Sequence, residues 1–226
     1  MSKAHTPPPE NPKAGAEHVA AILRDRIVKG ELAPRARIVE RQLSAELDVS
    51  RTPVREALKL LEADGLIEIS LHRGAIVSEF RPEDAFTLFE VIAVLEGLAA
   101  KRVCERITPD ILQHLEDLHG TMLNHHKAGR TNGYFDTNTV IHDFIIQTSA
   151  NPVLITTHQR LMIRARRGRY LAIMEPERLT QAIGEHEELM DAFRARQESK
   201  AAGIWETHLR HTGQTVAAVL RSGPDS

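Results

Sequence analysis

The chain has 226 residues, of which 42% are hydrophobic and 27% charged, a composition typical of folded globular proteins that excludes a largely disordered chain. Its 29 Lys and Arg against 31 Asp and Glu give a net charge of -2, so the overall charge does not indicate a nucleic-acid partner. A single cysteine, Cys104, excludes an intramolecular disulfide framework, and no apolar stretch reaches membrane-spanning length, so we expect a cytoplasmic protein with no membrane partner.

The first 80 residues predict a tail and three helices, followed by a pair of strands. Residues 1–13 carry four prolines and no periodic apolar pattern, so we expect a flexible tail there and a first domain over residues 14–80. Apolar residues recur at helical spacing in three segments, residues 16–28, 40–47 and 50–64. Two short apolar runs, residues 66–69 and 75–77, flank a predicted turn at residues 71–74. This order predicts a winged helix-turn-helix, whose third helix would enter the DNA major groove.

The start of the third predicted helix offers side chains suited to DNA. Arg51 and Arg55 are four residues apart and share a helix face, so each guanidinium can bind a guanine edge or a phosphate. The hydroxyls of Ser50 and Thr52 suit phosphate oxygens. An arginine pair is also typical of a solvated helix face, and acidic residues slightly outnumber basic ones in residues 14–80. Charge alone therefore leaves both interpretations open.

Two further segments are placed to contact DNA. Arg41, at the start of the second predicted helix, can reach the flanking sugar-phosphate backbone. His72 and Arg73 lie at the tip of the predicted wing, where they can contact the minor groove or its phosphates.

A family resemblance favours the DNA-binding interpretation. The run LSAELDVSRTPVREAL at residues 43–58 resembles the signature of GntR-family bacterial transcription regulators, and residues 27–34 and 73–77 match the same pattern in order and spacing. The resemblance covers about residues 16–78. It implies that the main DNA contacts are Arg41, Arg51, Thr52 and Arg55. It also implies that Ser50, His72, Arg73 and Gly74 assist them.

From residue 81 onward the sequence predicts an all-helical domain. No further strand pair is evident, and we expect about six helices between residues 81 and 222. Proline, glycine and N-cap residues mark their starts and breaks, at Pro82, Pro109, 129–133, Pro152, 174–176 and Ser199. The predicted fold class is therefore mostly α, with an N-terminal winged helix-turn-helix and a C-terminal helical bundle.

Three of the twelve histidines are candidates for one metal site in this bundle. His142, His186 and His208 each lie on a predicted helix with an apolar face, as ligands in a bundle core would. Asn138 precedes His142 by four residues, so both side chains can point at one ion. A buried histidine also occurs simply as a hydrogen-bonded residue, so a structural role stays open.

A second resemblance bears on these residues. Residues 84–220 resemble the helical effector-binding domain of the FadR subgroup, the FCD type, through stretches at residues 88–100, 138–152, 185–186 and 208–209. Family members with a metal site use an Asp and a His four residues apart and two further histidines. The resemblance implies a divalent metal, Zn²⁺ or Ni²⁺, held by Asn138, His142, His186 and His208. Because Asn138 replaces the family acid, we expect weaker metal binding and a preference for an anionic effector that completes the coordination.

A carboxylate effector would also need a cation from the protein. Family members often have an arginine where this chain has Ile92. We therefore name Arg102, Arg164 and Arg167 as candidate effector-binding residues, although the arginine-rich run at 160–169 also fits a solvated or interfacial surface.

The leading hypothesis is a transcription regulator, and a repressor by the usual direction in the family, that binds double-stranded operator DNA as a homodimer. A small organic-acid effector would change its operator affinity. The alternative is a metal-dependent hydrolase or lyase, which would need a general base beside a metal-bound water. Glu185 and Glu187 flank His186 and are expected to point away from it, and no His-Glu-x-x-His motif occurs. A purely architectural DNA binder would leave most of the chain without a task.

Overall fold

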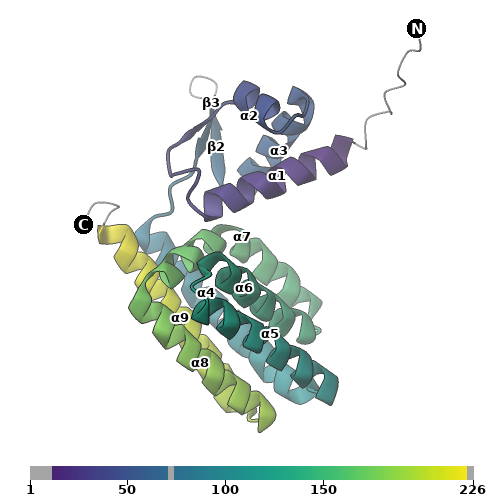
Figure 1. Cartoon of the computed structure of the whole chain (residues 1–226), viewed down its shortest axis with the longest axis vertical. Helices are drawn as coiled ribbons and strands as arrows, with labels where there is room; N and C mark the ends of the chain where they lie inside the picture. The colour runs from purple at the N-terminus through teal and green to yellow at the C-terminus, as the bar shows by residue number, and fades with distance from the viewer. Residues whose placement is uncertain (1–11, 71–73, 223–226) are drawn as a thin grey trace. The chain divides into compact units, whose positions relative to one another are not determined.

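The computed structural model describes residues 12–70 and 74–222, which fold as two compact units, one ending at Glu79 and the other beginning at Phe80 (Figure 1). Residues 1–11 of the expected tail and the wing residues His72 and Arg73 lie outside the described residues. Helix α1 begins at Pro12, so it includes the last two residues of the segment expected to be a tail. The elements described in the first unit are α1 (Pro12–Val28), β1 (Arg37–Ile38), α2 (Glu40–Glu46), α3 (Arg51–Ala63), β2 (Ile67–Ser70) and β3 (Gly74–Val77).

Helices α1 and α3 pack against each other through apolar faces. Val19, Leu23 and Ile27 of α1 are buried, and so are Val54 and Leu61 of α3, at the helical spacing that the sequence indicates. The opposite face and the first turn of α3 stay at the surface, so the start of this helix is presented to solvent.

The wing is a three-stranded antiparallel sheet in the order β1-β3-β2. Strands β2 and β3 pair so that Ile69 lies opposite Ala75 and Ser70 opposite Gly74. Gly74 has a φ of +71°, a left-handed conformation that glycine adopts without steric cost and that suits the end of a hairpin. The sequence does not predict β1, because a two-residue strand gives no periodic signal.

The described part of the second unit consists of six helices. Proline occupies the first turn of four of them, where its missing N–H costs no hydrogen bond. The side chains of Thr108 and Asn151 accept hydrogen bonds from first-turn amides, so they cap two of these helices. The helices are α4 (Pro82–Arg106), α5 (Pro109–Lys127), α6 (Thr131–Thr148), α7 (Pro152–Met174), α8 (Pro176–Arg194) and α9 (Glu198–Ser222).

Helices α4 and α9 form the most extensive packing of the second unit, and two glycines bring them close. A Cβ atom at Gly213 would lie 2.6 Å from the Cβ of Phe89, and one at Gly97 would collide with the side chain of Glu206. The close approach places the middle of α9 against the middle of α4. Among the helices of residues 12–70 and 74–222, none is long and apolar enough to cross a membrane.

Candidate metal centre and DNA-binding surface

Three histidines from three helices meet inside the second unit. His142 lies on α6, His186 on α8 and His208 on α9, and none is more than 4% exposed. One ligand nitrogen of each lies within 4.8 Å of the others. A tetrahedral zinc ion with ligands at about 2.1 Å keeps its nitrogens roughly 3.4 Å apart, so a small inward movement of the rings would close a three-histidine site.

Glu96 of α4 fixes the ring of His142. Its carboxylate accepts hydrogen bonds from Nδ1 of His142 at 2.5 Å and from Nε2 of His158 at 3.0 Å. With Nδ1 donating, Nε2 of His142 carries the lone pair that a metal needs. Burial acts to raise the pKa of Glu96, but its interactions with His142 and His158, hydrogen bonds included, hold that pKa well below its usual range. Glu96 is therefore ionised, and it orients the ring of His142 without being a candidate ligand itself.

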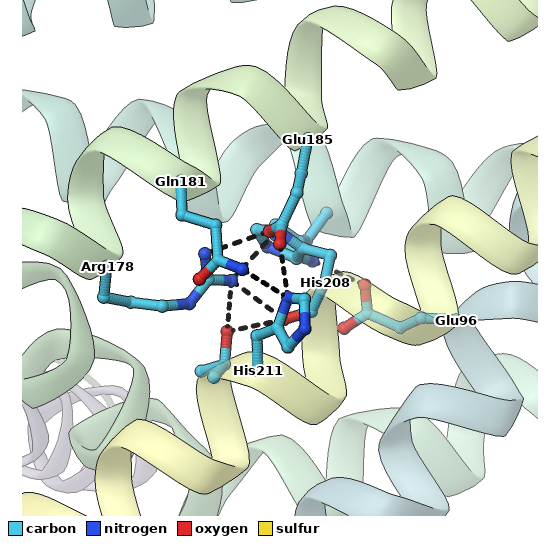
Figure 2. Close-up of polar contacts among 8 residues, drawn as sticks. Glu96, Arg178, Gln181, Glu185, His208 and His211 are labelled. Carbon is cyan, nitrogen blue, oxygen red and sulfur yellow. Dashed lines mark hydrogen bonds and ion pairs between the residues drawn. The ribbon is translucent and has the colours of Figure 1, made fainter.

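Glu185 of α8 orients His208 and links it to an arginine (Figure 2). Its carboxylate accepts hydrogen bonds from Nδ1 of His208 and Nδ1 of His211, each at 2.6 Å, and pairs with Arg178 at 2.9 Å. Burial acts to raise the pKa of Glu185, and these contacts lower it to about 2. The sequence places Glu185 on the far side of its helix from His186. The structure shows that Glu185 nevertheless contacts the site, because its carboxylate accepts a hydrogen bond from His208.

The indole of Trp205 packs against all three rings. It stacks on His208, with ring centroids 4.5 Å apart and planes at 7°, and on His142 at 4.5 Å and 30°. It meets His186 edge-on at 4.9 Å. Trp205 is fully buried and lies three residues before His208, so it holds the triad in place.

Several buried polar atoms of the candidate ligands lack a hydrogen-bond partner among the described residues. They are Nε2 of His142, Nε2 of His186 and Oδ1 of Asn138. A buried polar atom without a partner is costly, and a purely structural histidine would have both nitrogens satisfied. These unpaired atoms are lone-pair donors of the kind that Zn²⁺ or Ni²⁺ accepts. The residues present therefore fit a divalent metal.

The three histidines are neutral at neutral pH. Burial, reinforced by the charge of Arg169, lowers the pKa of His142 to about 3, and burial lowers the pKa of His208 to about 4. Burial and the neighbouring histidines also lower the pKa of His186 well below its ordinary value. Because a metal binds neutral imidazole, an ion entering this centre need not displace a proton.

The arginines expected to bind an effector do not lie in the buried interior. The side chain of Arg102 is 42% exposed and pairs with a neighbouring glutamate, Arg164 is exposed, and Arg167 is partly buried. Their role in effector binding stays a prediction. Two arginines that the sequence does not single out, Arg169 and Arg178, are only 3% and 4% exposed.

Apart from His72 and Arg73, which lie outside the described residues, the residues predicted to contact DNA lie on α2, at the start of α3 and on β3. Ser50 is the N-cap residue of α3, but its hydroxyl makes no capping hydrogen bond, so this hydroxyl and the first-turn amides can donate hydrogen bonds to a phosphate. The positions found exposed are Arg41, Ser50, Arg51, Thr52 and Arg55. Gly74 lies at the described edge of the wing.

An ion pair that the sequence does not predict holds Arg55. Its Nε lies 2.8 Å from a carboxylate oxygen of Glu40, and the two side chains are 60% and 37% exposed. The pair joins the start of α2 to the exposed face of α3. It therefore restricts the guanidinium of Arg55 at the surface.

A winged unit with an exposed third helix, followed by an all-helical unit with a buried histidine centre, defines a two-domain DNA-binding regulator. Residues 15–77 match the bacterial regulatory proteins of the gntR family, and residues 87–211 match the FCD domain. The chain belongs to the GntR family of transcription regulators and carries an FCD domain. This confirms the family that the sequence motifs indicate.

The chain is similar to known regulators over nearly its whole length. The "Uncharacterized HTH-type transcriptional regulator YdhC" of Bacillus subtilis is 25% identical over 205 residues, covering 90% of this chain and 92% of that protein. The transcriptional repressor RspR of Escherichia coli is 24% identical, covering 92% of each. The solved structure of McbR/YncC from Escherichia coli shares the fold, with a TM-score of 0.77, 23% identity and coverage of 92% of this chain and 97% of that chain. The relatives YdhC and RspR are named as transcription regulators, so the hydrolase or lyase hypothesis has no support.

Proposed function

We propose that this chain is a repressor that binds two-fold operator DNA as a homodimer and releases it when a small carboxylate effector binds the metal-containing helical domain. The observation that carries the proposal is the buried triad of His142, His186 and His208, in which Nε2 of His142 and Nε2 of His186 have no hydrogen-bond partner and so fit a metal. The exposed start of α3 in the other unit supplies the DNA-binding surface. The name of one relative, the repressor RspR, supports the direction of regulation.

The metal would be held by the three histidines together with the amide oxygen of Asn138. Zn²⁺ or Ni²⁺ suits three neutral imidazoles and one carbonyl oxygen. Bound there, the ion supplies a positively charged position that attracts an anionic oxygen of an effector. Glu96 and Glu185 do not ligate it in this proposal, because their oxygens already accept hydrogen bonds from histidine rings.

The DNA contacts would come from the first unit. Arg51 and Arg55 would bind base edges or phosphates from the start of α3, and Arg41 the flanking backbone. Assisting contacts are proposed for Ser50, Thr52, His72, Arg73 and Gly74.

The second copy would pack on an exposed apolar stripe of α4. Val91, Val94 and Leu98 follow each other at three- and four-residue steps, and they are 51%, 52% and 43% exposed. This spacing places all three on one helix face, as in helix pairs that pack along their length. A two-fold contact through this stripe would bring together the two copies that a two-fold operator requires.

The proposal is tested by fluorescence anisotropy of the full-length protein on DNA from upstream of its own gene, against a scrambled duplex of the same composition. At about 150 mM salt non-specific binding is weak, so a repressor of its own promoter should prefer the upstream fragment by at least tenfold. If the protein binds the upstream fragment and the scrambled duplex equally, genomic DNA fragments are selected for binding to the protein, and the measurement is repeated with them. Failure of selection to enrich any sequence would overturn the proposal.

A further inference from the structure

The groove between the wing and α3 contains an acidic residue on the side proposed to face DNA. The groove has a volume of about 390 Å³ and is bordered by the start of α2, by α3 and by all three strands of the wing. Its charged lining residues are Arg37, Glu40, Arg55 and Lys59, so Glu40 carries the only carboxylate among the described residues that line it. A carboxylate at this place repels DNA phosphates of any sequence. Its presence therefore indicates a role that offsets this repulsion.

Glu40 contacts a predicted DNA-binding residue through one particular atom. Its Oε2 accepts a hydrogen bond of 2.8 Å from Nε of Arg55. The terminal nitrogens of Arg55, Nη1 and Nη2, make no hydrogen bond to any residue in 12–70 or 74–222. Because the two side chains are 60% and 37% exposed, their ion pair adds little to the stability of the fold. Its main effect is therefore expected in DNA binding.

The occupied Nε restricts how Arg55 can bind a base. A guanidinium can donate to O6 and N7 of guanine with both terminal nitrogens, or with Nε and one terminal nitrogen. Because Nε of Arg55 donates to Glu40, only the two terminal nitrogens are left for guanine. The ion pair also holds a long, exposed side chain in one orientation before DNA binds, which lowers the entropy cost of ordering that side chain in the complex.

We propose that Glu40 is a positioning residue that sets the base specificity of Arg55, holding Nε so that Nη1 and Nη2 face O6 and N7 of a guanine. This inference rests on the proposed function, and it assigns Arg55 to a base edge rather than to a phosphate. A carboxylate that weakens binding to all DNA but improves one guanine contact widens the affinity difference between the operator and other sequences.

The variant Glu40→Met tests this role, because methionine has a similar length but neither charge nor a strong hydrogen-bond acceptor. Anisotropy titrations of the full-length protein compare the preferred operator duplex with a scrambled duplex. We expect the affinity for the scrambled duplex to rise about two- to threefold, and the ratio of operator to scrambled affinity to fall about fivefold or more. A residue that only supports the fold would lower both affinities, and one that only repels phosphates would raise both equally. Either result would overturn the proposal.

Glu46→Met is the matched control. Glu46 lies on the same helix and forms an ion pair of 2.7 Å with Arg26, which is not among the predicted DNA contacts. Its loss removes the same charge and the same kind of ion pair from α2, so the affinity ratio should stay at the wild-type value. A fall of the ratio in Glu46→Met equal to that in Glu40→Met would overturn the proposal, because any ion pair of α2 would then have the same effect.

Glu40→Asp separates the contact from the charge. Aspartate keeps the negative charge and is favourable in the first turn of a helix, but its shorter side chain withdraws the carboxylate from Nε of Arg55. We expect the affinity ratio to fall without any rise in the affinity for the scrambled duplex. A wild-type ratio in Glu40→Asp would show that the contact does not set specificity.

An operator with one altered atom tests the geometry of the guanine contact. Arg55→Ala, titrated with single base-pair variants of the operator, identifies the guanine that Arg55 binds. Replacing this guanine with 7-deazaguanine removes N7, and we expect the wild type to bind the altered operator about fivefold more weakly or worse. Glu40→Met and Arg55→Ala should lose much less. An equal loss in the wild type and Glu40→Met would overturn the positioning role.

The same titrations distinguish failure of this inference from failure of the proposed function. If Arg55→Ala loses the same affinity on every sequence, Arg55 binds a phosphate, and this inference alone is overturned. A wild type that selects no DNA overturns the proposed function, and this inference with it.

Discussion

Glu96 shows how a residue can define a site without contacting the metal. It is one of several glutamates on α4, and its place among Leu95 and Gly97 does not distinguish it from a surface residue. Only the fold shows that it is fully buried between His142 and His158. Its carboxylate selects the tautomer of His142 that leaves Nε2 for a metal.

We expect Glu96→Gln to weaken zinc binding by about 10- to 100-fold, the usual cost of losing a carboxylate that supports a histidine ligand. The measurement is competition against a chromophoric zinc chelator at pH 7.5. Glu90→Gln is the control, because Glu90 is exposed on the same helix. A wild-type zinc affinity in Glu96→Gln would show that the carboxylate does not tune His142.

For single residues, the sequence predicts the candidate metal ligands better than the residues that hold these ligands in place. Helical spacing singles out Asn138, His142, His186 and His208 because each lies on an amphipathic helix, and the structure brings the three histidines together. The supporting partners, Glu96, Glu185 and Trp205, come from contacts between helices far apart in sequence, which no local pattern encodes. For the same reason the sequence points to Arg102, Arg164 and Arg167, none of which is fully buried, while the buried Arg169 and Arg178 are found only in the fold.

The packing of α4 on α9 depends on where glycine stands. Both Gly203 and Gly213 lie on α9, but a Cβ at Gly203 would meet nothing within 4 Å, whereas one at Gly213 would lie 2.6 Å from the Cβ of Phe89. The same substitution should therefore have opposite effects at the two positions.

Gly213→Ala should lower the free energy of unfolding by about 1–3 kcal/mol, because the methyl group forces α4 and α9 apart. Gly203→Ala should raise it by roughly 0.5–1 kcal/mol, because alanine restricts the unfolded chain and favours the helix. Urea unfolding of the metal-free protein, followed by circular dichroism, measures both. Destabilisation of similar size in the two variants would contradict the close approach at Gly213.

Element boundaries in the helical unit are largely predictable because proline and capping residues mark them. Helices α4, α5 and α7 begin at the prolines that the sequence indicates. The exceptions have physical causes. Helix α1 begins at Pro12, since proline is tolerated in a first turn, and β1 is formed only by pairing with β3.

Helix α3 carries the prediction for DNA specificity. Arg51→Ala should cost about 1–3 kcal/mol on the preferred operator and relax the preference at one base pair, if that guanidinium binds a guanine edge. Lys59→Ala is the control, since Lys59 is exposed on the same helix two turns beyond its start. Anisotropy titrations with single base-pair variants of the operator measure both. An equal loss on every sequence would assign Arg51 to a phosphate instead.

In the whole molecule, helix α4 is common to the three proposed activities, which are DNA binding, metal binding and dimerisation. It follows the wing in the chain after residues 78–81 only, and its buried face holds Glu96 against His142. Its exposed face carries the apolar stripe of Val91, Val94 and Leu98. A change at the metal centre that moves α4 would therefore act on the contact between copies, which is the kind of shared element that couples two binding sites.

Val94→Glu tests this arrangement, because a two-fold contact would bury two like charges against each other. We expect the variant to sediment as a monomer at micromolar concentration and to bind the operator at least tenfold more weakly, since each copy then engages one half-site alone. Its zinc content should not change, because the stripe faces away from the triad. Val153→Glu is the control: Val153 is 74% exposed on α7, outside the stripe, so its oligomeric state and operator affinity should match the wild type. A dimeric Val94→Glu variant with intact operator binding would place the contact between copies on another helix.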